Sequence, residues 1–226
     1  MIKAIIFDFD GTLTHLQENT WKKIWKDLGY DTTSEDSAYK TQMRDYLNNT
    51  ISYQDWCDQT CIYYKKSKFS LQHLKDIAKT VVFIDGFEDF IDTLKKENIS
   101  LHIVSGNFVE LITSALGEKA KYFDSINANT LVFDNEGIIS QIIGTKYDYE
   151  GKAKFIEEYC SKYNILPSEI CFVGNGDNDQ WAHLSGCKTI CINPDTDTSS
   201  NKTMWHICLD KIDNINDLLP YIIDKK

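Results

Sequence analysis

The chain opens with a nearly continuous apolar run that ends in two carboxylates. Residues 3–7 (Lys-Ala-Ile-Ile-Phe) precede Asp8, and Asp10 follows after one phenylalanine. An apolar run without polar alternation is typical of a strand that is buried on both faces, as in a parallel sheet. The pattern therefore predicts a buried strand that leads into a polar turn at 8–12.

Residues 15–80 differ from this first segment in composition and in the spacing of apolar residues. They contain no proline and a single glycine, Gly29. Apolar side chains recur at i, i+3, i+4 and i+7, as at Trp21, Ile24, Trp25 and Leu28. This spacing predicts a small bundle of helices.

Beyond residue 85, helical and strand patterns alternate. The expected helices are 87–94, 108–115, 155–163 and a last one from about 214, and the expected strands are 99–104, 170–173, 188–192 and 205–209. A turn signal, Asn-Glu-Gly at 135–137, divides residues 131–143 into a hairpin. Alternation at this length implies βαβ units with a parallel sheet.

Together the patterns predict an α/β protein in two parts. We expect a Rossmann-like three-layer core with a parallel sheet, formed by residues 1–14 and 80–226. A small α-helical cap, residues 15–79, is expected as an insertion after the first strand. In such open α/β sheets, ligands bind beyond the carboxyl ends of the strands.

Composition narrows the class of protein. The chain has 24 Lys+Arg against 34 Asp+Glu, a formal net charge of −10, and Arg44 is its one arginine. A nucleic-acid partner is not expected, because phosphate tracking needs basic clusters. Apolar runs fall far short of the roughly 20 residues that cross a bilayer. Asp8 and Asp10 interrupt the N-terminal run, so neither a membrane partner nor a signal peptide is expected.

The cysteines indicate a reducing compartment. Seven are scattered along the chain, which is not the pattern of a disulfide framework, so we expect a cytoplasmic protein. Cys57/Cys61 and Cys187/Cys191 are each four positions apart, as metal ligands on a helix can be. Because neither pair has a partner pair at zinc-finger spacing, small buried side chains explain them better.

Polar segments follow three of the expected strands, at 8–12, 105–107 and 174–179. Since carboxyl ends of parallel strands share one edge of the sheet, these segments predict a single pocket. Asp8 and Asp10 suit a carboxylate that attacks and binds a cation beside one that acts as general acid and base.

The segment 105–107 suggests what the pocket binds. Ser105 and the amides of Gly106 and Asn107 are expected to open the helix at 108–115. Unpaired backbone donors and the helix dipole favour an anion there, and a phosphoryl group would fit.

Four motifs, in this order, resemble the haloacid dehalogenase superfamily in its phosphoserine-phosphatase-like branch. They are DFDGT at 8–12, VSGN at 104–107, Lys152 at the head of a helix and VGNGDND at 173–179. The hairpin at 131–143 resembles that branch too, and the resemblance covers the core nearly end to end. It implies an enzyme, a phosphatase that acts on small phosphorylated molecules.

The resemblance also implies roles for the carboxylates. Asp8 would be the nucleophile that forms an aspartyl-phosphate, and Asp10 would protonate the leaving oxygen and then activate water. Mg²⁺ would be held by the Asp8 carboxylate, the Asp10 backbone carbonyl and the side chain of Asn175, with Asp179 orienting these ligands.

A further set would surround the phosphoryl group. In the same resemblance Lys152 neutralises the charge on its oxygens, and Asn178 helps on the substrate side. The remaining members of the set are Thr12, Ser105, Gly106 and Asn107.

Two positions depart from the branch. Asn175 stands where the branch most often carries a second metal-binding aspartate. A unit charge pair at about 4 Å is worth roughly 4 kcal/mol at an effective dielectric of about 20. We therefore expect weaker metal binding unless Asp177 or Asp179 compensates. The cap segment 53–58 lacks the arginine that binds the substrate carboxylate in phosphoserine phosphatases, and Arg44 lies about one helix upstream.

The sequence thus predicts a magnesium-dependent phosphatase of a small phosphomonoester other than phosphoserine. Asp10 argues against a dehalogenase, because cleavage of a carbon–halogen bond needs no acid for a leaving oxygen. Two alternatives stay open: a phosphotransferase of the same superfamily, and a catalytically weakened phospho-ligand-binding protein, which Asn175 suggests. The leaving group and the oligomeric state also stay open.

Overall fold

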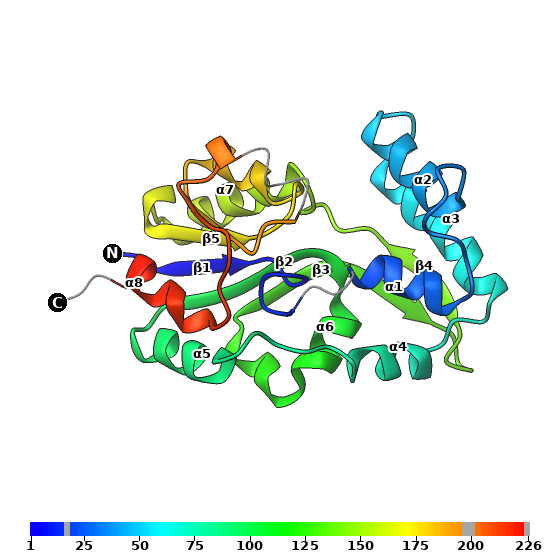
Figure 1. The fold of residues 1–226 in the computed structure, drawn as a ribbon, viewed down its shortest axis with the longest axis horizontal. Coiled ribbons are helices and arrows are strands. Elements are labelled where there is room, and N and C mark those ends of the chain that lie inside the picture. Colours follow the sequence, from blue (N-terminus) through cyan, green and yellow to red (C-terminus); the bar gives the residue numbers. More distant parts are fainter. Residues whose placement is uncertain (16–18, 196–201, 224–226) are drawn as a thin grey trace.

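The computed structural model describes residues 1–15, 19–195 and 202–223 (Figure 1). In these residues one seven-stranded sheet has the order β4-β3-β2-β1-β5-β6-β7. Its strands are β1 Ala4–Phe7, β2 Ser100–Phe108, β3 Ser125–Phe133, β4 Ile139–Ile143, β5 Ile170–Gly174, β6 Lys188–Ile192 and β7 Ile207–Leu209. All neighbours pair in parallel except β4, which is antiparallel to β3. The predicted α/β fold with a parallel sheet is confirmed, and β1 lies at its centre.

Helices cover both faces of the sheet, which gives three layers (Figure 1). They are α5 Phe87–Lys96, α6 Val109–Leu116, α7 Gly151–Tyr163 and α8 Leu219–Ile222, with short 3-10 helices at Gly117–Tyr122, Pro167–Glu169, Gln180–Ser185, Lys202–Met204 and Ile215–Leu218. The alternation along β1 explains the layers. Ile5 and Phe7 belong to the apolar cluster that contains Phe90 of α5, while Ala4 and Ile6 pack with α7.

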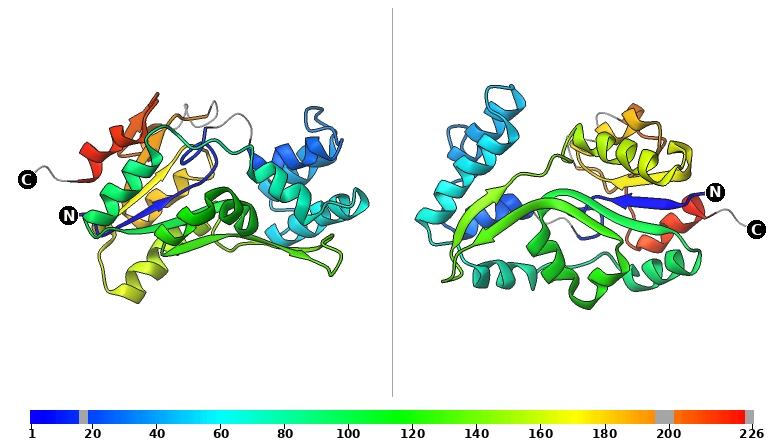
Figure 2. Two further views of the ribbon diagram at one scale, coloured as in Figure 1. Left: turned by 90° about the horizontal axis from the view of Figure 1, so that it is seen from below. Right: turned by 180° about the vertical axis from the view of Figure 1, so that it is seen from behind.

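Four helices lie between β1 and α5, where the sequence predicts a bundle. They are α1 Thr20–Asp27, α2 Ala38–Leu47, α3 Tyr53–Lys66 and α4 Leu71–Ala78, and we call them the cap helices. The side chains that cap them, Asn19, Ser37, Ser52 and Ser70, each accept a hydrogen bond from a backbone N–H of the first turn. Figure 2 shows these helices at one end of the sheet, beside the β3–β4 hairpin. That residues 15–79 form a separate domain stays a prediction.

The hairpin predicted at 131–143 is present as β3 and β4, and it reaches the cap helices. Gln54 of α3 donates through Nε2 to the carbonyl of Ile142 at 2.9 Å, and its Oε1 accepts from the N–H of Gly144 at 2.8 Å. The Gln54 side chain of α3 therefore joins the cap helices to the main chain of the hairpin.

The expectation that Ser105, Gly106 and Asn107 open a helix is wrong. These residues extend β2, which continues to Phe108 with an irregular register against β3, and α6 begins at Val109. The amide of Asn107 donates to Ser105 Oγ at 3.2 Å, and the amide of Phe108 donates to Asn107 Oδ1 at 2.6 Å. The Ser105 side chain thus accepts from the Asn107 amide, one of the two backbone donors that the sequence interpretation assigned to an anion.

Two expectations about composition can be compared with the fold. None of the described helices is long and apolar enough to span a bilayer. All seven cysteines lie in the described part of the chain, and all are free thiols.

Candidate active site

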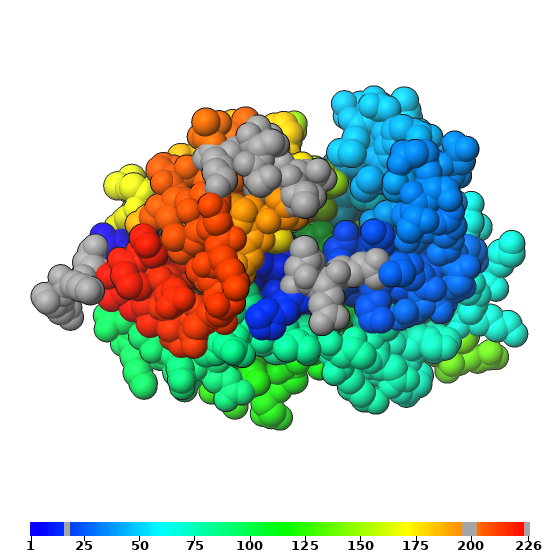
Figure 3. Space-filling model, in the orientation of Figure 1, coloured from blue at the N-terminus to red at the C-terminus, as the bar shows by residue number. Residues whose placement is uncertain are grey.

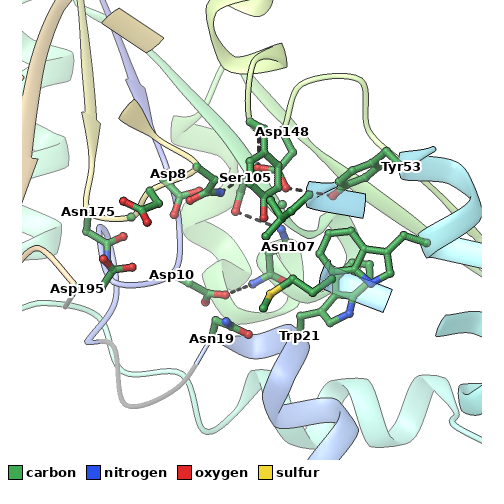
Figure 4. Close-up of a pocket in the computed structure, with 18 of the residues that line it drawn as sticks. Asp8, Asp10, Asn19, Trp21, Tyr53, Ser105, Asn107, Asp148, Asn175 and Asp195 are labelled. Carbon is green, nitrogen blue, oxygen red and sulfur yellow. Dashed lines mark hydrogen bonds between the residues drawn. The ribbon is translucent and has the colours of Figure 1, made fainter. Parts of the chain in front are cut away.

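The polar segments meet in one pocket at the carboxyl ends of β1, β2 and β5 (Figure 4). Its volume is about 420 Å³. Its core wall consists of Asp8, Asp10, Ser105, Gly106, Asn107, Asp148, Tyr149, Asn175, Gly176, Asp177, Asn178 and Asp195. Its cap wall consists of Asn19, Trp21, Tyr39, Met43, Leu47, Tyr53 and Trp56. Figure 3 shows the corresponding hollow between the core and the cap helices.

A buried charge cluster lies directly behind the pocket. Lys152, at the start of α7, is fully buried and lies 3.1 Å through Nζ from Asp8 Oδ1; it also bonds Asp179 Oδ1. Asp179 Oδ2 accepts from the backbone N–H groups of Asn175 and Gly176, each at 2.9 Å. Asp179 therefore fixes both the lysine and the loop after β5.

The cluster sets the pKa values of its members. Burial and then the charge of Asp179 raise the pKa of Asp8 to about 8, against the opposite effect of Lys152. Burial alone would lower the pKa of Lys152, but the charges of Asp179 and Asp8 outweigh it and raise this pKa. The ammonium group of Lys152 therefore stays protonated beside Asp8. Because the pKa of Asp8 is raised, a further cation near it would stabilise the carboxylate form.

Asp10 contacts the cap directly. Its Oδ1 accepts from the hydroxyl of Thr20 at 2.9 Å, and its Oδ2 accepts from the Thr20 amide at 3.0 Å and from Asn107 Nδ2 at 3.1 Å. Burial raises the pKa of Asp10, although these hydrogen bonds act in the opposite direction. A carboxyl group with a raised pKa is suited to donate a proton near neutral pH.

Asn175 packs against the loop that follows β1. The hydroxyl of Thr12 donates to Asn175 Oδ1 at 3.3 Å. Gly11 has φ +75°, and a Cβ there would lie 2.4 Å from Asn175 Nδ2, so the approach of the two loops requires glycine at this position. Thr12 itself is fully buried and lies behind the pocket surface.

Asp148 is the functional candidate that sequence interpretation missed. Its Oδ1 accepts from Asn178 Nδ2 at 2.9 Å, and its Oδ2 accepts from the hydroxyl of Tyr53 at 3.1 Å. A Cβ at Gly106 would lie 2.4 Å from Asp148 Oδ2, so the carboxylate lies directly over this glycine. Asp148 belongs to a turn without periodicity, and its one sequence signal is an acidic residue four positions before Lys152.

Asn129 of β3 binds Gly106 and Tyr53, the same two residues that Asp148 contacts. It is fully buried and donates through Nδ2 to the carbonyl of Gly106 at 2.6 Å and to Tyr53 Oη at 3.1 Å. Its Oδ1 accepts from the amide of Thr145 at 2.7 Å. β3 thereby positions both the segment around Gly106 and a cap tyrosine.

The site fits a hard divalent cation. The candidate ligands Asp8 and Asn175 offer oxygen atoms to one pocket, and burial, followed by the charge of Asp179, raises the pKa of Asp8, so a nearby cation would stabilise its carboxylate. No three His, Cys, Asp or Glu side chains of the described residues form a metal cluster by themselves, so such a site depends on the Asn175 amide and on a backbone carbonyl. The same finding leaves the cysteine pairs without a metal-binding cluster in the part of the chain that is described.

Predicted site residues thus occupy two layers. Those in contact with the pocket are Asp8, Asp10, Ser105, Gly106, Asn107, Asn175 and Asn178. Thr12, Lys152 and Asp179 are fully buried behind them. The predicted phosphate-binding Asn178 lies in the pocket and donates to Asp148.

Comparisons with known sequences find related hydrolases, among them phosphatases. A sequence model of haloacid dehalogenase-like hydrolases matches residues 2–182. The phosphoserine phosphatase of Archaeoglobus fulgidus is 25% identical over 178 residues, which cover 79% of this chain and 48% of that protein. The 2-hydroxy-3-keto-5-methylthiopentenyl-1-phosphate phosphatase of Lysinibacillus sphaericus is 29% identical over 173 residues, 75% of this chain and 66% of that protein. The chain therefore spans about half the length of the first relative and about two thirds of the second.

Solved structures share the fold. A phosphoserine phosphatase with a phospho-aspartyl intermediate analogue superposes with a TM-score of 0.73 at 21% identity, covering 98% of this chain and 99% of that chain. A hydrolase from Salmonella enterica serovar Typhi gives a TM-score of 0.77 at 17% identity, covering 100% of this chain and 72% of that one.

Proposed function

Since this chain belongs to the haloacid dehalogenase-like hydrolase family, we propose that it is a magnesium-dependent phosphatase of a small phosphomonoester. The observation that carries the proposal is the position of Asp8, in contact with the pocket and 3.1 Å from a buried ammonium group, with Asp10 in the same pocket. Relatives named as phosphatases support the same reaction class.

Catalysis proceeds in two displacements at phosphorus. Asp8 attacks, the bond between phosphorus and the substrate oxygen breaks, and Asp10 donates a proton to that oxygen. In the second step Asp10 takes a proton from water, which attacks phosphorus and releases Asp8. Lys152 offsets the negative charge on Asp8 and on the phosphoryl oxygens throughout.

Mg²⁺, when bound, supplies charge neutralisation for the phosphoryl oxygens and for the Asp8 carboxylate. Asp8, the backbone carbonyl of Asp10 and Asn175 would hold it, and Asp179 would fix the loop that carries Asn175. Ser105, Gly106 and Asn107 would line the phosphoryl group on the β2 side, with Asn178 on the substrate side. Thr12 would act by orienting the Asn175 amide.

Phosphoserine is not the substrate we propose, although several relatives are named phosphoserine phosphatases. No lysine, arginine or histidine occurs among the described residues that line the pocket. Arg44 is exposed on α2, where it contacts the carbonyl of Glu35 and the hydroxyl of Thr41. An α-carboxylate would therefore lie under the cap without a cation, at a cost of several kcal/mol.

The proposal is tested by trapping the intermediate. The protein is mixed with Mg²⁺ and p-nitrophenyl phosphate, quenched in acid and digested, and peptides are analysed by mass spectrometry. We expect a phosphorylated peptide that contains Asp8, formed at the rate of the p-nitrophenol burst. Sustained turnover with no phosphate on that peptide would contradict the covalent route.

Asn175 favours one second candidate, a phospho-ligand-binding protein with little turnover, because a charge is missing from the metal site. Calorimetric binding of phosphate esters without release of phosphate over hours, at saturating Mg²⁺, would support this candidate over the phosphatase.

A further inference from the structure

We infer that the leaving group of the substrate carries a positive charge, as an alkylammonium or quaternary ammonium group. The inference rests on the proposed phosphatase function and assigns its substrate class. Phosphorylated amino alcohols are the chemical class that fits.

The charges of the pocket point to a cation. Five carboxyl groups line it, those of Asp8, Asp10, Asp148, Asp177 and Asp195, and no basic side chain does so among the described residues. The nearby ammonium group of Lys152 is bound by Asp8 and Asp179 behind the surface. A bound Mg²⁺ would offset the charge of the phosphoryl group near Asp8, so Asp148 would face the rest of the substrate.

Asp148 places one of these charges beside the cap wall. The donors that bind its carboxylate are neutral: the amide of Asn178, the hydroxyl of Tyr53 and the backbone amide of Tyr149. Within the described chain no basic group lies within ion-pair distance of Asp148, although its charge, after those of Asp179 and Asp8, helps to raise the pKa of the buried Lys152. A charge held by neutral donors attracts a cation more strongly than one that is already paired.

Aromatic rings form the surface next to this carboxylate. Trp21 and Trp56 lie with their ring centroids 5.4 Å apart, and Tyr53 lies 5.8 Å from Trp56. Tyr149 adds a ring from the core wall. Aromatic faces beside a carboxylate are the surroundings in which quaternary ammonium groups are bound, through cation–π attraction and burial of the methyl groups.

Neutral head groups fit this wall less well. The indole N–H groups of Trp21 and Trp56 are buried without a hydrogen-bond partner, so the rings present carbon to the pocket. The hydroxyl of Tyr53 is already bonded to Asp148 and Asn129. The wall therefore offers few donors to the hydroxyl groups of a sugar, and a stacked base would leave Asp148 without an opposite charge.

The test compares esters that differ in charge alone. Phosphocholine and its neutral isostere 3,3-dimethylbutyl phosphate have the same shape, and phosphoethanolamine lacks only the carboxylate of phosphoserine. We expect kcat/KM to favour the cationic member of the first pair and the carboxylate-free member of the second by about tenfold or more. p-Nitrophenyl phosphate reports the phosphatase activity itself, and the affinity for choline against 3,3-dimethylbutanol is measured by calorimetry.

Two variants test whether Asp148 is the residue that causes the preference for cationic esters. Asp148→Asn keeps the shape and an acceptor for Asn178 while it removes the charge, and we expect the phosphocholine preference over its isostere to fall by about fivefold or more. Asp58→Asn is the control, because Asp58 is exposed on the same helix as Tyr53, lies outside the pocket and accepts from Gln54. It should change the preference by less than about twofold, as a screened surface charge does.

The outcomes separate the two proposals. Turnover of p-nitrophenyl phosphate without a preference for phosphocholine over its isostere overturns the cation inference and leaves the phosphatase standing. An equal loss of preference in both variants overturns it too, because the effect would then be one of overall charge. If no ester is hydrolysed, the phosphatase proposal fails. The cation inference is then tested by calorimetry, and choline that binds no more tightly than 3,3-dimethylbutanol overturns it.

Discussion

The core wall of the pocket is rich in carboxylate and amide side chains that form hydrogen bonds, whereas the cap wall is rich in aromatic rings that pack on one another. On the core side, Lys152 joins Asp8 to Asp179, and Asp179 holds the amide of Asn175. On the cap side, Trp56 stacks on Tyr46 with centroids 5.3 Å apart and packs on Trp21. A hydrogen-bonded network has strict geometry, while apolar packing tolerates exchange of side chains of similar volume. We therefore expect substitutions in the cap wall to change the reaction itself less than substitutions at Asp8 or Asp10.

The largest effect is expected at Asp8. Asp8→Asn should lower kcat for every ester by at least about 10⁴-fold, because the nucleophile is lost. The variant should be as stable as the parent or more so, since the raised pKa of Asp8 means that the fold disfavours its charge. Phosphate release and thermal unfolding at pH 7 measure the two quantities. If the variant lost its folded state together with its activity, the prediction would be contradicted, because the loss of activity would then follow from unfolding.

Asp10→Asn comes next, with a loss of about 10²–10⁴-fold in kcat for alkyl phosphates. p-Nitrophenolate leaves without a proton, so phosphorylation by p-nitrophenyl phosphate should be slowed much less than hydrolysis of the intermediate. The phosphorylated Asp8 peptide should therefore accumulate in this variant. Equal losses with good and poor leaving groups, and no accumulation, would remove Asp10 from its assigned role.

Asn175→Asp should change the metal requirement. We expect the Mg²⁺ midpoint of activity to fall by a few-fold to about 100-fold, with the metal-free variant less stable because another carboxylate joins the cluster. Titration of activity and of the melting temperature with Mg²⁺ gives both values. Since Asp179 is already bound to Lys152 and two amides, unchanged midpoints would point to Asp177 or Asp195 as the compensating charge.

Tyr53→Phe is the smallest of these changes and tests the cap wall. It removes the hydroxyl shared by Asp148 and Asn129 and should cost about 1 kcal/mol of stability. The preference for cationic over neutral esters should fall by about two- to fivefold, because Asp148 loses a donor that fixes its position. The Mg²⁺ midpoint should stay as in the parent, and a shift of that midpoint would show that the two walls are coupled.

The fold was largely predictable because its signals are local. The run at 3–7 and the helical spacing of Trp21 and Ile24 reflect burial periodicity, which sequence displays directly. The β2 extension was missed because Gly106 and Asn107 are typical loop residues, while their strand geometry comes from pairing with β3, which no local signal reveals.

Some residues of the candidate site were predictable from local motifs, and others were not. Asp8, Asp10 and Lys152 lie in short motifs whose order along the chain made them predictable. Asp148 and Asn129 act through partners from other segments, Tyr53 and Gly106, and such long-range contacts leave no pattern in neighbouring positions. Trp21 and Trp56 are buried and also line the pocket.

The central place of β1 has a consequence for the time course of folding. β1 precedes the other strands along the chain, yet its partners begin near residues 100 and 170. The bonds from Asp8 to Lys152 and from Thr12 to Asn175 close separations of 144 and 163 residues. Closing such long loops loses chain entropy before contacts compensate, and ribosomal synthesis at about 5–20 residues per second delays β5 by roughly ten seconds or more. Asp8 can therefore meet Lys152 and the loop after β5 only late in synthesis, and β1 has an unpaired apolar edge until β5 has left the ribosome.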